Sequence, residues 1–251
     1  MTPVDDLGTP LELAVPRRVV SLVPSLTEAI AASRPELLVA ATDWCTHPAD
    51  LAVARVRGTK NPDLKHIAEL APDLVVCNQE ENRELDVRRL RAAGIPVWVT
   101  RIQTLAEAFT SMRRLFTEAL AGEVPDWLVA AERAWQPAPR RPTITAVTAI
   151  WRDPWMVVGS DTFTGDLLAR LGVGNAFDGG DQRYPQTTPA EILAAGPDVV
   201  LLPDEPYVFT ATDGPEAFPG RRTVLVSGRL LTWYGPSLVG ARAELETALD
   251  R

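Results

Sequence analysis

The sequence is poor in the residues on which disulfide frameworks and metal sites depend. It holds two cysteines and two histidines in 251 residues. Cys45 and Cys77 cannot build a disulfide framework, so we expect both to be free thiols. A structural zinc site is also not expected, because it needs four Cys or His ligands at close spacing and these four residues are scattered.

Long apolar runs and an excess of basic residues are missing too. No run approaches the roughly 18 apolar residues that span a membrane. The net charge is −8, whereas phosphate binding needs a concentrated basic surface. The first 16 residues carry acids and prolines in place of the basic start and apolar core of a secretory signal. We therefore expect no nucleic-acid partner, no membrane insertion and a cytoplasmic location, or an extracytoplasmic one if a leader has been removed.

Motifs that carry catalysis are absent as well. The sequence contains no H-E-x-x-H, G-x-S-x-G or P-loop pattern. Ser25, Asp43 and His47 are present, but nothing in their spacing joins them into a triad. We predict that the protein is not an enzyme and requires no cofactor.

What the chain does contain is an alternation of β-rich and amphipathic helical segments, which predicts an α/β fold with parallel sheets covered by helices. In the first half we predict strands at residues 19–23, 35–44, 71–78 and 95–100, and helices at 27–33, 64–70, 82–94 and 104–122. In the second half we predict a strand at 143–150, a loop, short strand and helix within 151–172, a helix and strand within 189–205, a strand at 222–228 and a tail helix at 237–249. Ser25 or Thr27 is expected to cap the first helix, and Gly94 to close the third.

A linking helix separates the two halves. Pro125 suits a first helical position and Asp126 a first turn, and the helix can run to about residue 134 or 135. Residues 136–142 (QPAPRRP) must then be extended, because proline breaks helices. We predict an N-terminal lobe at 1–121, a linking helix and extended connector at 122–141, and a C-terminal lobe at 142–251.

An internal repeat relates the two halves. Residues 67–80 match residues 192–205 at an offset of 125, which aligns Ile67 with Ile192, Pro72 with Pro197, Asp73 with Asp198 and Glu80 with Glu205. The same offset places residues 19–23 on residues 144–148. Ligands of open parallel sheets bind outside the carboxyl ends of the strands, and Glu80 and Glu205 each lie just past such an end. If the two lobes face each other, these carboxylates flank one cleft.

Four segments resemble a known family: SLVPSLTEAI, GTKNP, LAPDLVVCNQEENRE and RYPQTTPAEILAAGPDVVLL. They resemble the helical-backbone (class III) substrate-binding proteins of ABC importers, and within them the vitamin B12 (cobalamin) binders, with iron-siderophore binders as relatives. The resemblance implies two Rossmann-like lobes joined by a rigid helix, with the ligand in the cleft between the lobes. It also implies an acidic residue on each lobe that docks on the transporter's membrane subunit, here Glu80 or Glu81 and Glu205. We expect a monomer.

A corrin is a broad disc edged with amides, which flat aromatic walls and a few donors can hold. Loop aromatics near strand ends are the candidates: Trp44, Trp151, Trp155, Tyr184, Trp233 and Tyr234. Trp98, Trp127 and Trp135 are expected to pack in the core. By resemblance, Trp155 and Tyr184 match cleft aromatics, and Thr59, beside Lys60, stands where some cobalamin binders carry tryptophan.

His47 stands where the family carries a tyrosine in the first-lobe loop. A neutral imidazole there could bind cobalt or another metal, or form a hydrogen bond within its loop. His66 reads as a surface residue of a helix.

Two other functions stay open. The ligand could be a ferric siderophore, haem or bare metal ion; an anionic chelate would need cleft arginines, for which Arg101, Arg152, Arg183 and Arg221 are available. Alternatively, the chain could be an enzyme that modifies a corrinoid or a chelate.

Overall fold

The computed structural model describes residues 2–136 and 141–250 and forms two compact units. The first unit comprises residues 1–102, 106–130 and 234–236, and the second comprises residues 103–105, 131–233 and 237–251. The division falls inside helix α5 (Asp126–Trp135), and the chain returns to the first unit at Tyr234–Pro236. The lobe limits drawn from the sequence stay a prediction, and residues 137–140 of the predicted extended connector lie outside the described residues.

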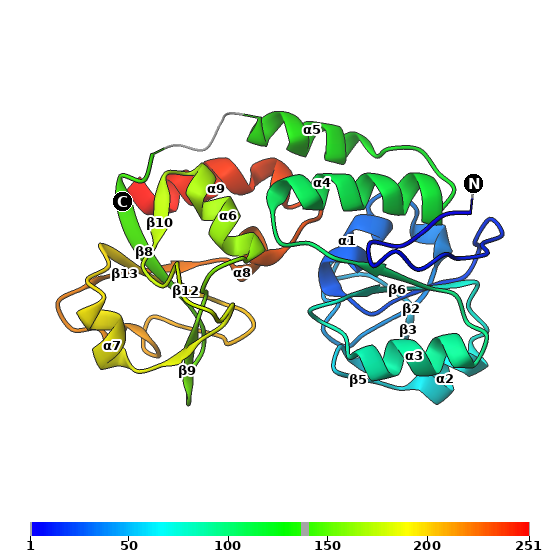
Figure 1. The fold of residues 1–251 in the computed structure, drawn as a ribbon, viewed down its shortest axis with the longest axis horizontal. Coiled ribbons are helices and arrows are strands. Elements are labelled where there is room, and N and C mark those ends of the chain that lie inside the picture. The colour runs from blue at the N-terminus through cyan, green and yellow to red at the C-terminus, as the bar shows by residue number, and fades with distance from the viewer. Residues whose placement is uncertain (1, 137–140, 251) are drawn as a thin grey trace. The chain divides into compact units, whose positions relative to one another are not determined.

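In the described part of the first unit, five strands form a parallel sheet in the order β3-β2-β1-β6-β7. These strands are β1 (Val19–Ser21), β2 (Leu38–Ala41), β3 (Ala54–Arg55), β6 (Leu74–Asn78) and β7 (Val97–Thr100). A separate antiparallel pair consists of β4 (Arg57–Gly58) and β5 (Asn61–Pro62). The helices are α1 (Pro24–Ala31), α2 (Leu64–Glu69), α3 (Glu84–Ala92) and α4 (Leu105–Arg114), with a 3₁₀ turn at Pro35–Leu37 and a π-helical turn at Leu115–Ala119. In Figure 1, α2 and α3 cover one face of this sheet, and α1 and α4 cover the other.

The central strands of this sheet are apolar throughout because helices cover both of their faces. All five residues of β6 are buried, as is typical of a parallel strand between two helix layers. Val20, Val75 and Cys77 pack with Ile67 of α2 and Leu90 of α3 in one core. This packing fixes the carboxyl ends of β1, β2 and β6 along one edge, where the loops of interest begin.

In the described part of the second unit, the sheet has the order β11-β9-β8-β12-β13, with β10 also paired to β8. The strands are β8 (Ile144–Trp151), β9 (Trp155–Val157), β10 (Val173–Asn175), β11 (Gln186–Thr187), β12 (Val199–Pro203) and β13 (Arg222–Val226). The helices are α6 (Phe163–Arg170), α7 (Pro189–Ala194), α8 (Gly228–Thr232) and α9 (Leu238–Asp250), with a 3₁₀ turn at Pro215–Ala217. Figure 1 shows α7 on one face of the sheet and α6, α8 and α9 on the other. Strands β8, β12 and β13 are parallel, whereas β9 runs antiparallel to β8 and β11.

The internal repeat is confirmed in most elements. The bounds of α2 and α7, and of β6 and β12, differ by 125 residues at both ends. Ala71 and Gly196 at that offset both have positive φ, 44° and 65°.

The first strand of the repeat has a different offset. Val19 pairs with Leu74, whereas the partner of Val199 is Ala146, so the equivalent positions of β1 and β8 are 127 residues apart. A shift of two residues preserves which side chains face each side of a strand, and for this reason the hydrophobic pattern did not reveal it.

The start of the first predicted helix differs from the structure. Helix α1 begins at Pro24 with Val23 as its N-cap and has no side-chain cap, so the predicted capping by Ser25 or Thr27 is wrong. Pro24 occupies the first helical position instead, where its fixed φ angle suits the start of a helix. The hydroxyl of Thr27 instead donates to the Val23 carbonyl oxygen at 2.9 Å. Gly94, with φ 79°, ends α3 as predicted.

Candidate functional site

The loop that follows β6 presents Glu80 and Glu81 on a fixed backbone. The Asn78 Oδ1 atom accepts from the backbone amides of Glu80 (2.8 Å) and Glu81 (3.2 Å). The Asn82 carboxamide closes the turn by accepting from the Asn78 amide and donating to the carbonyl oxygens of Leu22 (3.2 Å) and Thr59 (3.0 Å). Asparagine serves here because its side chain bonds to nearby backbone groups in a turn.

The same loop is held from two further directions within the first unit. The Lys60 ammonium donates to the Glu80 carbonyl oxygen at 2.6 Å. The buried Tyr234 hydroxyl donates to Glu81 Oε1 at 3.4 Å. Burial, and then the negative charge of Glu81, raises the pKa of Tyr234 well above 10. The Tyr234 hydroxyl therefore stays protonated and can donate its hydrogen bond to Glu81. Thr59 and Lys60, predicted as ligand contacts, both touch this loop.

The equivalent acid of the second unit, Glu205, is positioned by a glycine. Gly228 packs so closely that an added Cβ would lie 2.4 Å from Glu205 Cγ and 2.7 Å from its carbonyl oxygen. The Asp204 carboxylate accepts from the Gly228 amide at 2.7 Å. Glu80 and Glu205 thus occupy the same position in the two repeats, two residues past the ends of β6 and β12. Their docking role stays a prediction.

An exposed tryptophan marks the loop after β2. Trp44 is 66% exposed, and its indole nitrogen lies beside the position that a Cβ on Gly58 would take. The loop is anchored by the buried Cys45 thiol, which accepts from the Thr27 hydroxyl at 3.0 Å. The Arg55 guanidinium also donates to the Cys45 carbonyl oxygen at 2.9 Å. Trp44 therefore stands out from a rigid loop at the carboxyl edge of the sheet.

His47 is half-buried in the same loop, and its Nδ1 lies 3.2 Å from the Thr46 hydroxyl. Among residues 2–136 and 141–250, no three His, Cys, Asp or Glu side chains gather closely enough to hold a metal ion. His47 could therefore supply one ligand to a metal that arrives inside a cargo molecule. Its metal-binding role stays a prediction.

In the second unit, Trp151 ends β8 and is 42% exposed. Its ring meets Tyr207 edge-on, with centroids 5.7 Å apart. Tyr207 packs on Phe209 at 4.7 Å, and Phe209 stacks on Trp155 at 5.6 Å. The exposed Trp151 face is thus the outer end of an aromatic series that runs into the core.

Three other candidate aromatics are buried. Trp155 lies in β9 rather than in a loop, is 7% exposed and packs against Phe209 and Phe218 in the second-unit core. Its strand position corrects the expected loop. Trp233 and Tyr234 lie, as expected, in a loop, which joins α8, a helix that the sequence did not predict, to α9. Both rings are nevertheless buried. A ligand-binding role for the three residues stays a prediction.

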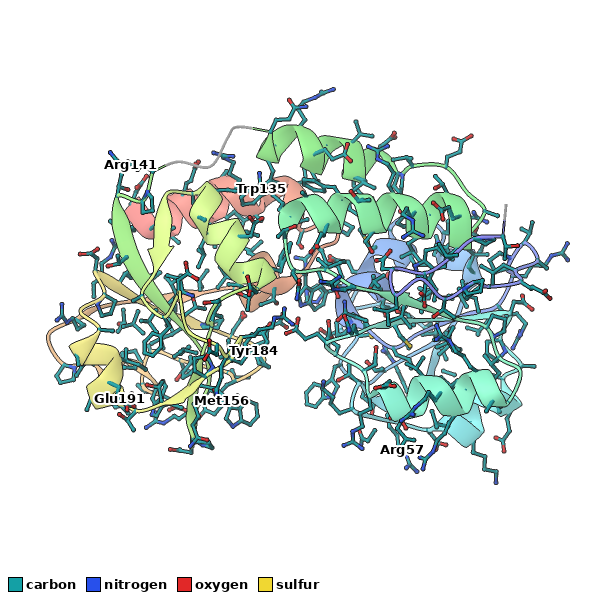
Figure 2. All side chains as sticks on the ribbon, viewed as in Figure 1. Arg57, Trp135, Arg141, Met156, Tyr184 and Glu191 are labelled. Atoms are coloured by element: carbon teal, nitrogen blue, oxygen red, sulfur yellow. The ribbon has the colours of Figure 1, made fainter. Side chains whose placement is uncertain are left out.

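Tyr184 is half-buried in a loop before β11, as predicted, with the Arg183 guanidinium 5.7 Å from its ring centroid. Figure 2 shows Tyr184 and Met156 in the second unit. The backbone of this loop pairs with the segment after β9, since the Gly159 amide donates to the Arg183 carbonyl oxygen at 2.8 Å. Of the three tryptophans expected in the core, Trp98 and Trp135 are confirmed as fully buried, and Trp127 is half-buried.

The four arginines considered for an anionic chelate have different surroundings within their own units. Arg152 forms ion pairs with Asp213 and Glu216. Arg221 lies beside the start of β13 and donates to the Pro197 carbonyl oxygen, at the amino edge of the sheet. Arg183 donates to the Asp161 carbonyl oxygen, and Arg101 lines a hollow of about 320 Å³ on the first unit.

Sequence reasoning missed Tyr207, Phe209 and the acidic partners of Arg152. The run PYVF at residues 206–209 was a usable signal, because two aromatics directly after a predicted strand suit a strand-end loop. Asp213 and Glu216 had no such signal. Their pairing with Arg152 joins residues more than 60 positions apart.

Each unit carries an acid just past a strand end and an exposed tryptophan, in a loop after β2 in the first unit and at the end of β8 in the second. The sequence profile of the family described as "Periplasmic binding protein" matches residues 19–218. The chain therefore belongs to the periplasmic binding protein family, and its resemblance to class III substrate-binding proteins is confirmed.

Individual relatives add detail. The chain is 25% identical to a vitamin B12-binding protein of Pectobacterium atrosepticum over 205 residues, which cover 75% of this chain and 72% of that protein. Its fold is similar to the periplasmic vitamin B12-binding protein of Vibrio cholerae (TM-score 0.77, 20% identity, 94% and 97% covered). It is also similar to the heme-binding protein BhuT in complex with two hemes (TM-score 0.76, 25% identity, 92% and 97% covered).

The family fixes the general role. Its members bind small molecules, which they carry as cargo rather than as a cofactor, and deliver them to ABC transporters. The predicted class of protein is therefore confirmed. The described residues contain no helix both long and apolar enough to cross a membrane. The predicted location and monomeric state stay predictions.

Proposed function

We propose that this protein captures a cobalamin-like corrinoid for import or carriage. The observation that carries the proposal is the pair of exposed tryptophans, Trp44 and Trp151, each mounted on a rigid segment at the carboxyl edge of its sheet. Flat, preorganised aromatic faces suit a broad disc with apolar faces. The likeness to vitamin B12-binding proteins across three quarters of the chain supports the choice of ligand.

Cyanocobalamin provides a direct test. Isothermal titration with purified protein should give saturable 1:1 binding at micromolar or lower concentration, and the melting temperature should rise. A ligand present at 100 times its Kd adds about 2.7 kcal/mol to the free energy of unfolding. Absence of both heat and thermal shift at micromolar ligand contradicts the proposal.

Variants of the two tryptophans test the site itself. Trp44→Ala and Trp151→Ala should each weaken cyanocobalamin binding by at least about tenfold, because burying a large apolar side chain contributes roughly 1.5–3 kcal/mol. Val239→Ala is the matched control, since Val239 is an equally exposed apolar residue of α9. Unchanged affinity for cyanocobalamin in both tryptophan variants would contradict a binding role for Trp44 and Trp151.

Haem is the second candidate ligand, because one similar structure holds two hemes. A haem iron needs an axial ligand such as histidine or tyrosine, and His47 and Tyr184 are the candidates. Titration with haem should then give a Soret shift that His47→Ala or Tyr184→Phe abolishes. Cyanocobalamin binding with no such shift decides for the corrinoid.

We also propose that Glu80 or Glu81 and Glu205 dock on arginines of a transporter's membrane subunit. Carboxylates held on fixed loops can form charge-assisted bidentate contacts with arginine. Glu205→Gln combined with both Glu80→Gln and Glu81→Gln should leave ligand affinity unchanged and reduce transport into vesicles that contain the importer. Equal transport by the variant and the parent protein contradicts this role.

A further inference from the structure

An arginine surrounded by acids lies directly beside the exposed tryptophan of the second unit. Arg152 follows Trp151 in the turn between β8 and β9, and its guanidinium lies 5.5 Å from the Trp155 ring centroid. Its Nη1 atom contacts the carboxylates of Asp213 and Glu216, the latter at 2.5 Å. We call Arg152, Tyr207, Asp213 and Glu216 the Arg152 cluster.

The cluster is tied to the aromatic series by direct contacts. The Tyr207 hydroxyl donates to Asp213 Oδ2 at 2.7 Å, while the Tyr207 ring meets Trp151 edge-on. The Glu216 carboxylate also accepts from the Gly214 amide at 2.6 Å. Asp213 is therefore held by the same tyrosine that packs against Trp151, and Glu216 is held by the backbone beside Asp213.

The charge of this region is negative although it contains an arginine. Asp153, whose side chain is 86% exposed, lies 3.7 Å from Arg152 Nε. Three carboxylates around one guanidinium leave two net negative charges. The Arg152 side chain is itself only 24% exposed, so its acidic partners occupy donors that an incoming carboxylate would need.

We propose that the Arg152 cluster is a charge filter that selects planar ligands with neutral, amide-type edges and rejects those with carboxylate edges. The proposal rests on the ligand-binding role of Trp151 given above. A ligand carboxylate brought to Trp151 approaches a cluster with two net negative charges, in which the Arg152 Nε and Nη1 atoms already contact carboxylates. Like charges 4 Å apart cost about 1 kcal/mol in bulk water and about 4 kcal/mol near a protein surface. The lower cost amounts to roughly fivefold in affinity and the higher one to roughly several hundredfold.

A ligand pair that differs in one charge isolates the effect. Cyanocobalamin carries neutral amide side chains, and a cobalamin monocarboxylic acid has one of these amides hydrolysed to a carboxylate. The wild-type protein should bind the monocarboxylic acid about tenfold more weakly than cyanocobalamin. Because charges at the surface are screened by salt, this ratio should shrink between 0.02 M and 0.5 M salt.

Removal of the acids tests the cluster. Asp213→Asn combined with Glu216→Gln frees the guanidinium, so the preference for cyanocobalamin should disappear or reverse. Glu244→Gln combined with Asp250→Asn removes the same charge from exposed positions on α9, and it should keep the full preference. Melting curves establish that each variant is folded, and the salt series on the wild-type protein needs no variant.

The outcomes separate the two proposals. Binding of cyanocobalamin with no preference over the acid, or a preference that the α9 variant loses equally, overturns the filter and leaves the proposed function intact. Absence of cyanocobalamin binding overturns the proposed function and the filter together.

Discussion

At the scale of single residues, close packing and burial decide which positions accept change. Gly228 is required by the side chain and carbonyl of Glu205, and no turn conformation imposes it. Cys45 and Cys77 are fully buried free thiols, as expected from the sequence. The glycine is required by a residue distant in the chain. The two thiols are buried by the segments that pack around them.

Gly228→Ala should lower the free energy of unfolding by about 1–3 kcal/mol, because an added methyl group must displace Glu205. Gly180→Ala is the matched control, since a Cβ at Gly180 meets nothing within 4 Å. Urea unfolding of both variants measures the difference. Equal free energies of unfolding for the two variants would mean that the loop containing Glu205 moves to accommodate the methyl group with no loss of stability.

The two thiols should not react with a thiol reagent in the native protein at pH 8. Burial raises the pKa of Cys45, and that of Cys77 much more strongly, whereas the thiolate is the reactive form. Two equivalents should react once the chain is unfolded in guanidinium. Rapid reaction of either thiol without denaturant would show that its surroundings open readily.

At the scale of elements, the two repeats use different residues for the same task. Helix α2 is capped by Asp63, which accepts from the His66 amide. Helix α7 is capped by Thr188 in a capping box with Glu191, and Figure 2 shows Glu191 on that helix. Both caps satisfy amides that a helix start leaves without partners.

Thr188→Ala and Asp63→Ala should each cost about 1 kcal/mol of stability, a typical value for a lost cap. Hydrogen bonds from Thr188 and then Thr187 lower the pKa of Glu191. Its stabilising effect is therefore present above the pKa of the unfolded chain and is lost as pH falls through the lower folded value. Carboxyl chemical shifts followed against pH should show the Glu191 midpoint rising in Thr188→Ala. An unchanged midpoint would contradict the capping box.

At the scale of the whole molecule, two similar units each carry their own sheet and their own core. In each unit, an aspartate directly before β6 or β12 forms hydrogen bonds at the start of the neighbouring strand, β1 or β8. Asp73 accepts from the Arg17 and Arg18 amides, and Asp198 accepts from the Thr145 amide and hydroxyl. Asp73 and Asp198 therefore form similar hydrogen bonds at equivalent positions of the two repeats.

Asp73→Ala and Asp198→Ala should destabilise the protein by similar amounts, about 1 kcal/mol each. Because each variant changes a separate unit, the effects should add in the double variant. Chemical denaturation measures the three values. A cost confined to one variant would mean that the two bonds are not equivalent.

The sequence by itself determined the α/β class, the repeat, the linking helix up to Trp135 and the family. The first three features depend on the periodicity of apolar residues and on local turn chemistry, both of which can be read along the chain. The family was identified from the resemblance of four sequence segments. The binding role of the candidate residues stays a prediction. Only the tertiary structure decided that Trp155, Trp233 and Tyr234 are covered, that β1 and β8 correspond at an offset of 127, and that Arg152 is held by acids. Burial of an aromatic ring and pairing of a charge depend on what distant segments bring to that point, and no local pattern records it.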